Sequence, residues 1–113
     1  MIRGSVHKGL GDTSRQLPDY DAITERVLGY IPYPGSLNVW LDRPVKLGET
    51  NLIVDSRWGK YKFWPAKING VDCHIVRPPL GRNRPRDAEI VAPIGLREHF
   101  NLRDGNKVEV EVL

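Results

Sequence analysis

The sequence predicts a small, mainly β-structured barrel, and three observations support this fold class. Several short segments alternate apolar and polar residues with a period of two, and turn residues separate them. Only one segment has the residue spacing of a substantial helix. The helices that would have to connect parallel strands are missing, which argues against a doubly wound α/β fold. With 113 residues, 40% of them hydrophobic, the chain is expected to form a single domain, residues 1–113, around one modest core.

The N-terminal third predicts a strand, a polar loop and the one substantial helix. Residues 2–8 alternate and predict the strand, and residues 9–18, which include two glycines, predict the loop. Residues 19–28 predict the helix, which Gly29 would end. We expect Asp19 or Asp21 to cap this helix and an apolar stripe to face the core; the stripe consists of Ile23, Val27 and Leu28.

The remaining elements are short. From residue 36 the period changes to two, so Leu37, Val39 and Leu41 should share one face of a strand and Ser36, Asn38 and Trp40 the other. Asn69-Gly70 predicts a hairpin over residues 63–76, because this dipeptide favours the tight turns that join antiparallel strands. Further strands are predicted at 50–55, 88–93 and 107–113, with one or two helical turns at 95–101. The total is about six strands and one or two short helices.

Charge and cysteine content exclude several classes of protein. The net charge of +3 and the isoelectric point of about 9.2 suit an anionic ligand but are too mild to require nucleic acid. Cys73 is the only cysteine, so no internal disulfide can form, which is typical of a reducing compartment. No apolar run approaches membrane-spanning length, and the N-terminus has no signal-peptide hydrophobic region. We therefore expect a cytoplasmic protein that does not contact a membrane.

A glycine loop, GLGDTSR at residues 9–15, is the first candidate binding segment. Glycines allow a backbone to approach a phosphate closely, and successive N–H groups can form an anion-binding nest. The loop lacks the Gly-Lys-Ser/Thr sequence of a P-loop and the GxGxxG pattern of dinucleotide-binding folds. From these residues alone, a plain turn is as good an interpretation as a phosphate site.

A second candidate is the stretch GYIPYPGSLNVWL at residues 29–41. Pro34 and Gly35 fix the point at which the strand begins, so Ser36 and Asn38 point in the same direction. A hydroxyl and an amide oxygen on one face are suitable ligands for Mg²⁺, which takes a few protein oxygens beside substrate phosphates. The alternative is a polar, solvent-facing side of a half-buried strand, which the residues alone favour.

The other chemically capable residues give weaker signals. His7, His74 and His99 have no metal-binding spacing. Glu89 should share a strand face with Val91, where it could bind a polar ligand group or simply face solvent. The loop at 77–87 could clamp a phosphate or be a solvated surface; its arginines are Arg77, Arg82, Arg84 and Arg86.

Taken together and in this order, these segments resemble the archaeal-type CTP-dependent riboflavin kinases. Three stretches carry the resemblance: GSVHKGLGD at 4–12, LGYIPYPGSLNVWLD at 28–42 and EIVAPIGLREHFNLRDGNKVEV at 89–110. The resemblance covers nearly the whole chain, and its middle stretch is the most specific. The last stretch is less specific, because related barrels that bind DNA share it.

The resemblance implies a six-stranded cradle-loop barrel that uses Mg²⁺ and transfers the γ-phosphoryl group of CTP to the 5′-hydroxyl of riboflavin, giving FMN and CDP. It implies that Ser36 and Asn38 bind the metal and that Glu89 and Gly81 contact the flavin. It places the nucleotide on two segments, which consist of Leu10, Gly11, Asp12, Thr13, Ser14 and Arg15, and of Ile94, Gly95, Leu96 and Arg97. No general base is implied, because phosphoryl transfer depends mainly on positioning and charge stabilisation. We expect a monomer.

Three positions depart from the family pattern. Ser36 replaces a commoner threonine, Thr13 replaces a second glycine of the loop, and Gly81 stands where the family has a threonine that contacts the flavin phosphate. Because the third departure falls on the acceptor side, a kinase of another small molecule is an alternative function. A nucleic-acid-binding barrel without catalysis is another alternative, although it would not need the turn before Ser36.

Overall fold

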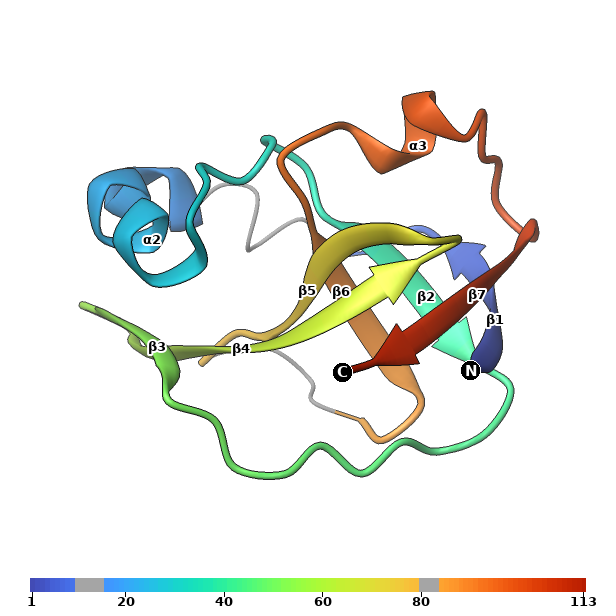
Figure 1. The fold of residues 1–113 in the computed structure, drawn as a ribbon, viewed down its shortest axis with the longest axis horizontal. Helices are drawn as coiled ribbons and strands as arrows, with labels where there is room; N and C mark the ends of the chain where they lie inside the picture. Colours follow the sequence, from blue (N-terminus) through green and yellow to red (C-terminus); the bar gives the residue numbers. More distant parts are fainter. Residues whose placement is uncertain (10–15, 80–83) are drawn as a thin grey trace.

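The computed structural model describes residues 1–9, 16–79 and 84–113 of the chain. Their secondary structure consists mostly of antiparallel strands, with a short 3-10 helix, η1, directly before the first α-helix (Figure 1). The elements are β1 (Ile2–His7), η1 (Leu17–Tyr20), α2 (Asp21–Leu28), β2 (Leu37–Leu41), β3 (Leu52–Ser56), β4 (Gly59–Ile68), β5 (Val71–Arg77), β6 (Asp87–Val91), α3 (Leu96–His99) and β7 (Lys107–Val112). The predicted strands and helices are thus confirmed, with ends that differ by a few residues.

Six of these strands close into an antiparallel barrel, which confirms the predicted fold class. The strand order is β3-β4-β5-β6-β2-β1-β7, and an additional pairing of β4 with β7 joins the two ends of the barrel. In the described part of the chain β3 pairs with β4 alone and extends the sheet beyond the barrel (Figure 1). No helix among the described residues has the length and apolar character needed to cross a lipid bilayer.

One edge of strand β4 pairs with β5, and the other edge changes its partner at Pro65. Before this residue β4 pairs with β3, as in Leu52 opposite Phe63, and after it with β7, as in Ala66 opposite Val112. The Pro65 carbonyl accepts a hydrogen bond from Leu113 N–H at 3.0 Å, so the missing N–H of the proline also faces this side of β4. Proline is therefore tolerated in a central strand, because it lies where one partner ends and the next begins.

The predicted hairpin about Asn69-Gly70 is present, and both residues have positive φ angles, 46° and 82°. Such angles are those of the two central residues of a type I′ turn. A second hairpin, between β3 and β4, was not predicted. Its turn contains Arg57 and Trp58, which give no strong turn signal, and Gly59 follows with a φ of 125°.

Two hydrophobic clusters stabilise the fold. The first fills the barrel and includes the inward residues of β2, namely Leu37, Val39 and Leu41, as their alternation predicted. The second lies between the outer surface of β3 to β6 and the η1–α2 segment; its buried members are Leu17, Val54, Tyr61, Phe63, Val76 and Val91. Among the described residues, η1 and α2 therefore cover the part of the barrel's outer surface that β3 to β6 form (Figure 1).

Two details predicted for the helix are wrong. Neither Asp19 nor Asp21 caps α2: the N-cap residue is Tyr20, and it makes no side-chain cap hydrogen bond. The chain enters α2 from η1, so Asp21 N–H already donates to the Pro18 carbonyl and needs no cap. Of the predicted apolar stripe, Val27 and Leu28 pack against the second cluster as expected, but Ile23 is exposed. Thr24 is buried instead and donates its hydroxyl proton to the Tyr20 carbonyl at 2.8 Å.

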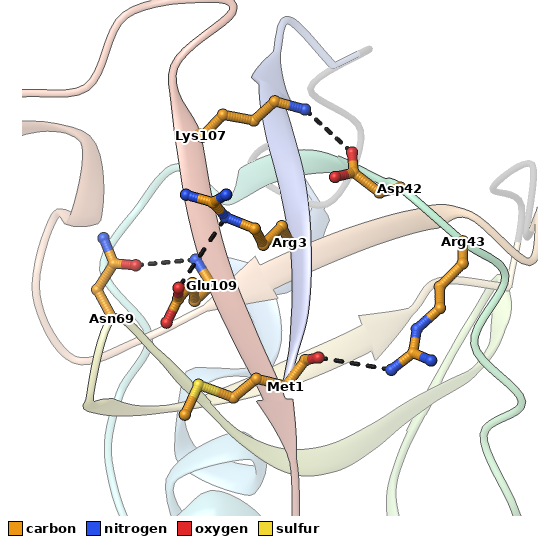
Figure 2. Close-up of polar contacts among 7 residues, drawn as sticks. All are labelled: Met1, Arg3, Asp42, Arg43, Asn69, Lys107 and Glu109. Atoms are coloured by element: carbon orange, nitrogen blue, oxygen red, sulfur yellow. Dashed lines mark hydrogen bonds and ion pairs between the residues drawn. The ribbon is translucent and has the colours of Figure 1, made fainter.

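Side-chain polar contacts surround the paired strands β1 and β7 (Figure 2). Lys107 Nζ lies 3.0 Å from Asp42 Oδ1, and Arg3 Nε lies 4.0 Å from Glu109 Oε1. The Asn69 side-chain oxygen accepts a hydrogen bond from Glu109 N–H at 2.9 Å. These side chains are exposed, so the ion pairs contribute little to stability and the backbone ladder holds the strands together.

Candidate active site

The turn at Pro32–Ser36, which we call the Pro-Gly turn, fixes the start of β2. Tyr33 N–H donates to the Ala92 carbonyl at 2.8 Å, which ties the turn to the end of β6. Gly35 has a φ of 118°, a conformation that residues with a side chain rarely adopt, and no atom lies near its missing side chain. The glycine is therefore needed for the backbone path that brings Ser36 to the edge of the β2–β6 ladder.

Ser36, Asn38 and Glu89 lie together on the outer surface of the barrel. The Ser36 hydroxyl donates a hydrogen bond of 2.7 Å to Glu89 Oε2. Asn38 is directly opposite Glu89 in the antiparallel register of β2 and β6, so their side chains emerge on the same face. The structure thus brings the two predicted metal ligands beside the predicted flavin contact.

Strand β1 completes this surface from the other side. His7 is opposite Asn38 in the β1–β2 register, and its Nε2 lies 3.6 Å from Asp87 Oδ1. Gly9 follows β1, and any Cβ atom at this position would overlap the side-chain amide of Asn38. Sequence reasoning did not foresee either role, because both depend on which strand pairs with β2.

The residues on this surface fit a magnesium ion. Ser36 and Asn38 offer neutral oxygens, and Glu89 adds a carboxylate. Ser36 uses its proton toward Glu89, so the lone pairs of its oxygen remain open to a cation. Among the described residues no group of three or more His, Cys, Asp or Glu side chains could hold a metal ion. Two neutral oxygens and one carboxylate form a small set of hard donors, which suits a cation that shares its coordination with substrate phosphates, as Mg²⁺ does.

The arginines of the 77–87 loop have different surroundings. Arg77 donates from Nη1 to the Asp87 carbonyl at 2.7 Å; burial lowers its pKa, and the charges of Asp87 and Glu89 act in the opposite direction. Arg86 donates to the Leu41 carbonyl at 2.9 Å and lies over the Trp40 ring, which makes it a structural brace. Arg84 is exposed, and Arg82 and Gly81 lie outside the described residues.

The two predicted nucleotide segments are described only in part. The first, Leu10 to Arg15, lies outside the described residues. In the second, Leu96 is buried in the barrel cluster, Arg97 pairs with Asp104 at 3.1 Å and Ile94 is exposed. A Cβ atom on Gly95 would come within 3.1 Å of the Tyr33 ring, so this segment packs against the Pro-Gly turn.

A half-buried polar pair, Tyr30 and His74, lies behind the turn. The Tyr30 hydroxyl is 2.8 Å from His74 Nδ1 and donates to the Val91 carbonyl at 3.2 Å. The Tyr30 hydroxyl has one proton, which it donates to the Val91 carbonyl. Its contact with His74 is therefore a hydrogen bond when His74 carries its proton on Nδ1 and donates it to the Tyr30 oxygen. Burial raises the pKa of Tyr30 and lowers that of His74, while the charge of Asp72 partly opposes the second shift. Both groups are therefore neutral near pH 7.

We expect the replacement His74→Gln to flatten the dependence of stability on pH. Because burial lowers the folded-state pKa of His74, the unfolded chain binds a proton more readily. The stability contributed by neutral His74 is fully present above the unfolded-state pKa of about 6.5 and is lost as the pH falls towards the folded-state pKa. Urea unfolding between about pH 7.5 and about pH 5.5 measures this. Parallel pH profiles for the two proteins would contradict the assignment.

The structure defines a small β-barrel protein: a closed six-stranded barrel that carries a cluster of polar oxygen side chains beside a glycine-fixed turn. A model of the CTP-dependent riboflavin kinase family, described as domain of unknown function DUF120, matches residues 6–112. The chain belongs to this family.

Curated relatives agree with the family match. The chain is 35% identical to a riboflavin kinase of Thermococcus kodakarensis over 100% of this chain and 59% of the relative. It is 39% identical to a riboflavin kinase of Methanocella arvoryzae, over 97% of this chain and 56% of the relative. A riboflavin kinase of Pyrobaculum aerophilum is 36% identical over 97% of this chain and 59% of the relative. The chain thus spans less than three fifths of the length of these relatives.

Proposed function

We propose that this barrel is a riboflavin kinase that transfers the γ-phosphoryl group of CTP to the 5′-hydroxyl of riboflavin, giving FMN and CDP. The observation that carries the proposal is the Ser36–Glu89 hydrogen bond with Asn38 opposite Glu89. Family membership and the names of the relatives support the kinase, and the family name supports CTP as the donor.

Each residue of the site has a task in this reaction. One carboxylate oxygen of Glu89 has no hydrogen bond to any described residue. This oxygen can accept a hydrogen bond from the riboflavin 5′-hydroxyl and so orient that hydroxyl for attack. Ser36 holds the other oxygen, which fixes the carboxylate. Ser36 and Asn38 would hold Mg²⁺, which would neutralise charge on the nucleotide phosphates when bound. Arg77 lies near Glu89 and places a positive charge on the same surface.

The test is incubation of the purified chain with riboflavin, Mg²⁺ and either CTP or ATP, with FMN separated and quantified by its fluorescence. We expect FMN to form faster with CTP than with ATP and formation to stop when EDTA removes the metal. Faster turnover of ATP would remove the cytidine preference but keep the kinase. Absence of FMN with both nucleotides, together with salt-sensitive binding to DNA or RNA, would favour the nucleic-acid-binding alternative instead.

A further inference from the structure

Two polar side chains meet above strand β2, next to Asn38. His7 of β1 is opposite Asn38 in the strand register, and Asp87 of β6 is opposite Trp40, two residues further along β2. His7 Nε2 nevertheless lies 3.6 Å from Asp87 Oδ1, so the two side chains cross β2 diagonally. The diagonal passes over Val39, whose own side chain points into the barrel and leaves this space free. We call this contact the His7–Asp87 bridge.

Both partners of the bridge have further contacts that hold them in place. His7 Nδ1, on the other edge of the ring, lies 3.1 Å from the Lys8 carbonyl. Arg77 donates a hydrogen bond of 2.7 Å to the Asp87 carbonyl, and its positive charge lies near the Asp87 carboxylate. The two side chains are 41% and 26% exposed. The bridge is therefore a packed part of this surface and differs from a pair of fully solvated side chains.

The Asn38 side chain, in contrast, is held by packing alone within the described part of the chain. It has no hydrogen bond to another described residue. Its amide lies directly against Gly9, with the nitrogen nearer than the oxygen to the position that a Cβ atom there would take. The terminal torsion of an asparagine is broad, so an amide without hydrogen bonds keeps one orientation only where neighbouring atoms block the others.

We infer that the His7–Asp87 bridge positions Asn38 by blocking one of these orientations. The bridge fills the space between Asn38 and Trp40, so the amide cannot turn along β2 in that direction. Gly9 marks the flank on which the amide rests. The remaining direction leads towards Ser36, which lies two residues back on the same face. This inference rests on the proposed function, which assigns the Asn38 oxygen to Mg²⁺ beside Ser36.

The size of the effect follows from the rotamers that become available. A side-chain torsion has three staggered positions, so a freed Asn38 that visits all of them would keep the metal-binding one in about a third of the molecules. Apparent affinity falls by the same fraction, so His7→Ala should raise the Mg²⁺ concentration for half-maximal FMN formation about threefold. The rate at saturating Mg²⁺ should stay near that of the wild type, because bound metal selects the correct rotamer.

NMR tests the position of Asn38 without metal, nucleotide or turnover. Three-bond Hα–Hβ couplings of isotope-labelled asparagines show whether a side chain occupies one rotamer or averages over several. We expect one rotamer for Asn38 in the wild type and averaged couplings in His7→Ala, with the signals assigned by their absence from Asn38→Ala. Asn69 is the internal reference, because its side-chain oxygen accepts a hydrogen bond from Glu109 N–H at 2.9 Å.

Three further variants control this experiment. Lys67→Ala is the matched control, because Lys67 also lies 3.6 Å from its partner, Asp72, and is also 41% exposed, but belongs to the β4–β5 hairpin. It should leave the Asn38 couplings and the Mg²⁺ dependence unchanged. His7→Gln should restore most of the wild-type behaviour, because glutamine fills similar space and can direct an amide N–H towards Asp87. Asp87→Ala removes the other half of the bridge and should also give averaged couplings.

The outcomes separate this inference from the proposed function. Wild-type Asn38 couplings in both His7→Ala and Asp87→Ala would overturn it and leave the bridge as a contact that only stabilises the strands. Averaged couplings with an unchanged Mg²⁺ dependence of FMN formation would overturn the link between the bridge and the metal. Averaged couplings in both variants, without FMN formation by the wild type, would support the positioning of Asn38 and contradict the kinase.

Discussion

Asn38→Ala is expected to lower the rate of FMN formation by about 100-fold or more while the protein remains folded. The side chain lies on the outer surface of β2, between His7 of β1 and Glu89 of β6 in the strand registers. Its removal takes an oxygen from the proposed magnesium site without opening a cavity in the core, since the inward residues of β2 are Leu37, Val39 and Leu41. The rate of FMN formation, measured against Mg²⁺ concentration, checks this.

Asn51→Ala is the matched control, because Asn51 is exposed directly before β3, a strand that pairs with β4 and not with β1, β2 or β6 in the described part of the chain. We expect wild-type activity from the control and a shift to higher Mg²⁺ concentrations for any residual activity of Asn38→Ala. A folded Asn38→Ala protein with wild-type turnover would remove Asn38 from the metal site.

Gly9→Ala is expected to lower the same rate by about 10-fold to 100-fold through Asn38. The added methyl group would occupy the space of the Asn38 amide. We expect the Asn38 side chain to rotate away, because a side chain moves more easily than the backbone at residue 9 or at residue 38. The φ of Gly9 is not in the left-handed region, so alanine is compatible with the backbone and the effect is steric. Circular dichroism and thermal unfolding should show a native fold.

Two comparisons isolate this steric mechanism. Gly48→Ala should be neutral, because nothing lies within 4 Å of the added atom and its φ is also outside the left-handed region. In an Asn38→Ala background, Gly9→Ala should cause no further loss, since the side chain that it displaces is already absent. Additive losses would show that Gly9 acts on another part of the site.

Local patterns in the sequence predicted the parts of the fold that depend on neighbouring residues. Alternation along residues 36–41 placed Ser36 and Asn38 on the face opposite Leu37, because side chains of a strand point to its two sides in turn. Asn69-Gly70 predicted its hairpin because two positive φ angles are a property of the dipeptide itself.

Relations between distant segments could not be predicted in this way. The Ser36–Glu89 bond joins residues 53 positions apart and depends on the β2–β6 register, which no local pattern specifies. The same holds for the barrel closure between β4 and β7 and for the contact of Gly9 with Asn38. In the helix, the expected role of Asp21 as a cap was wrong because η1 precedes α2.

The pairing of β1 with β2 and β7 has a consequence for folding. Strand β1 contacts β7 through pairs such as Ile2 with Val110, so the barrel closes only when the two ends of the chain meet. The hairpins between β3, β4 and β5 involve near neighbours in sequence and can form earlier, because closing a short loop costs less entropy.

A slip of one residue between β2 and β6 would turn Leu37 and Val39 outwards and bury Ser36 and Asn38. Correct burial of Leu37 and Val39 therefore also fixes the register that places Ser36 and Asn38 beside Glu89 on the outer surface.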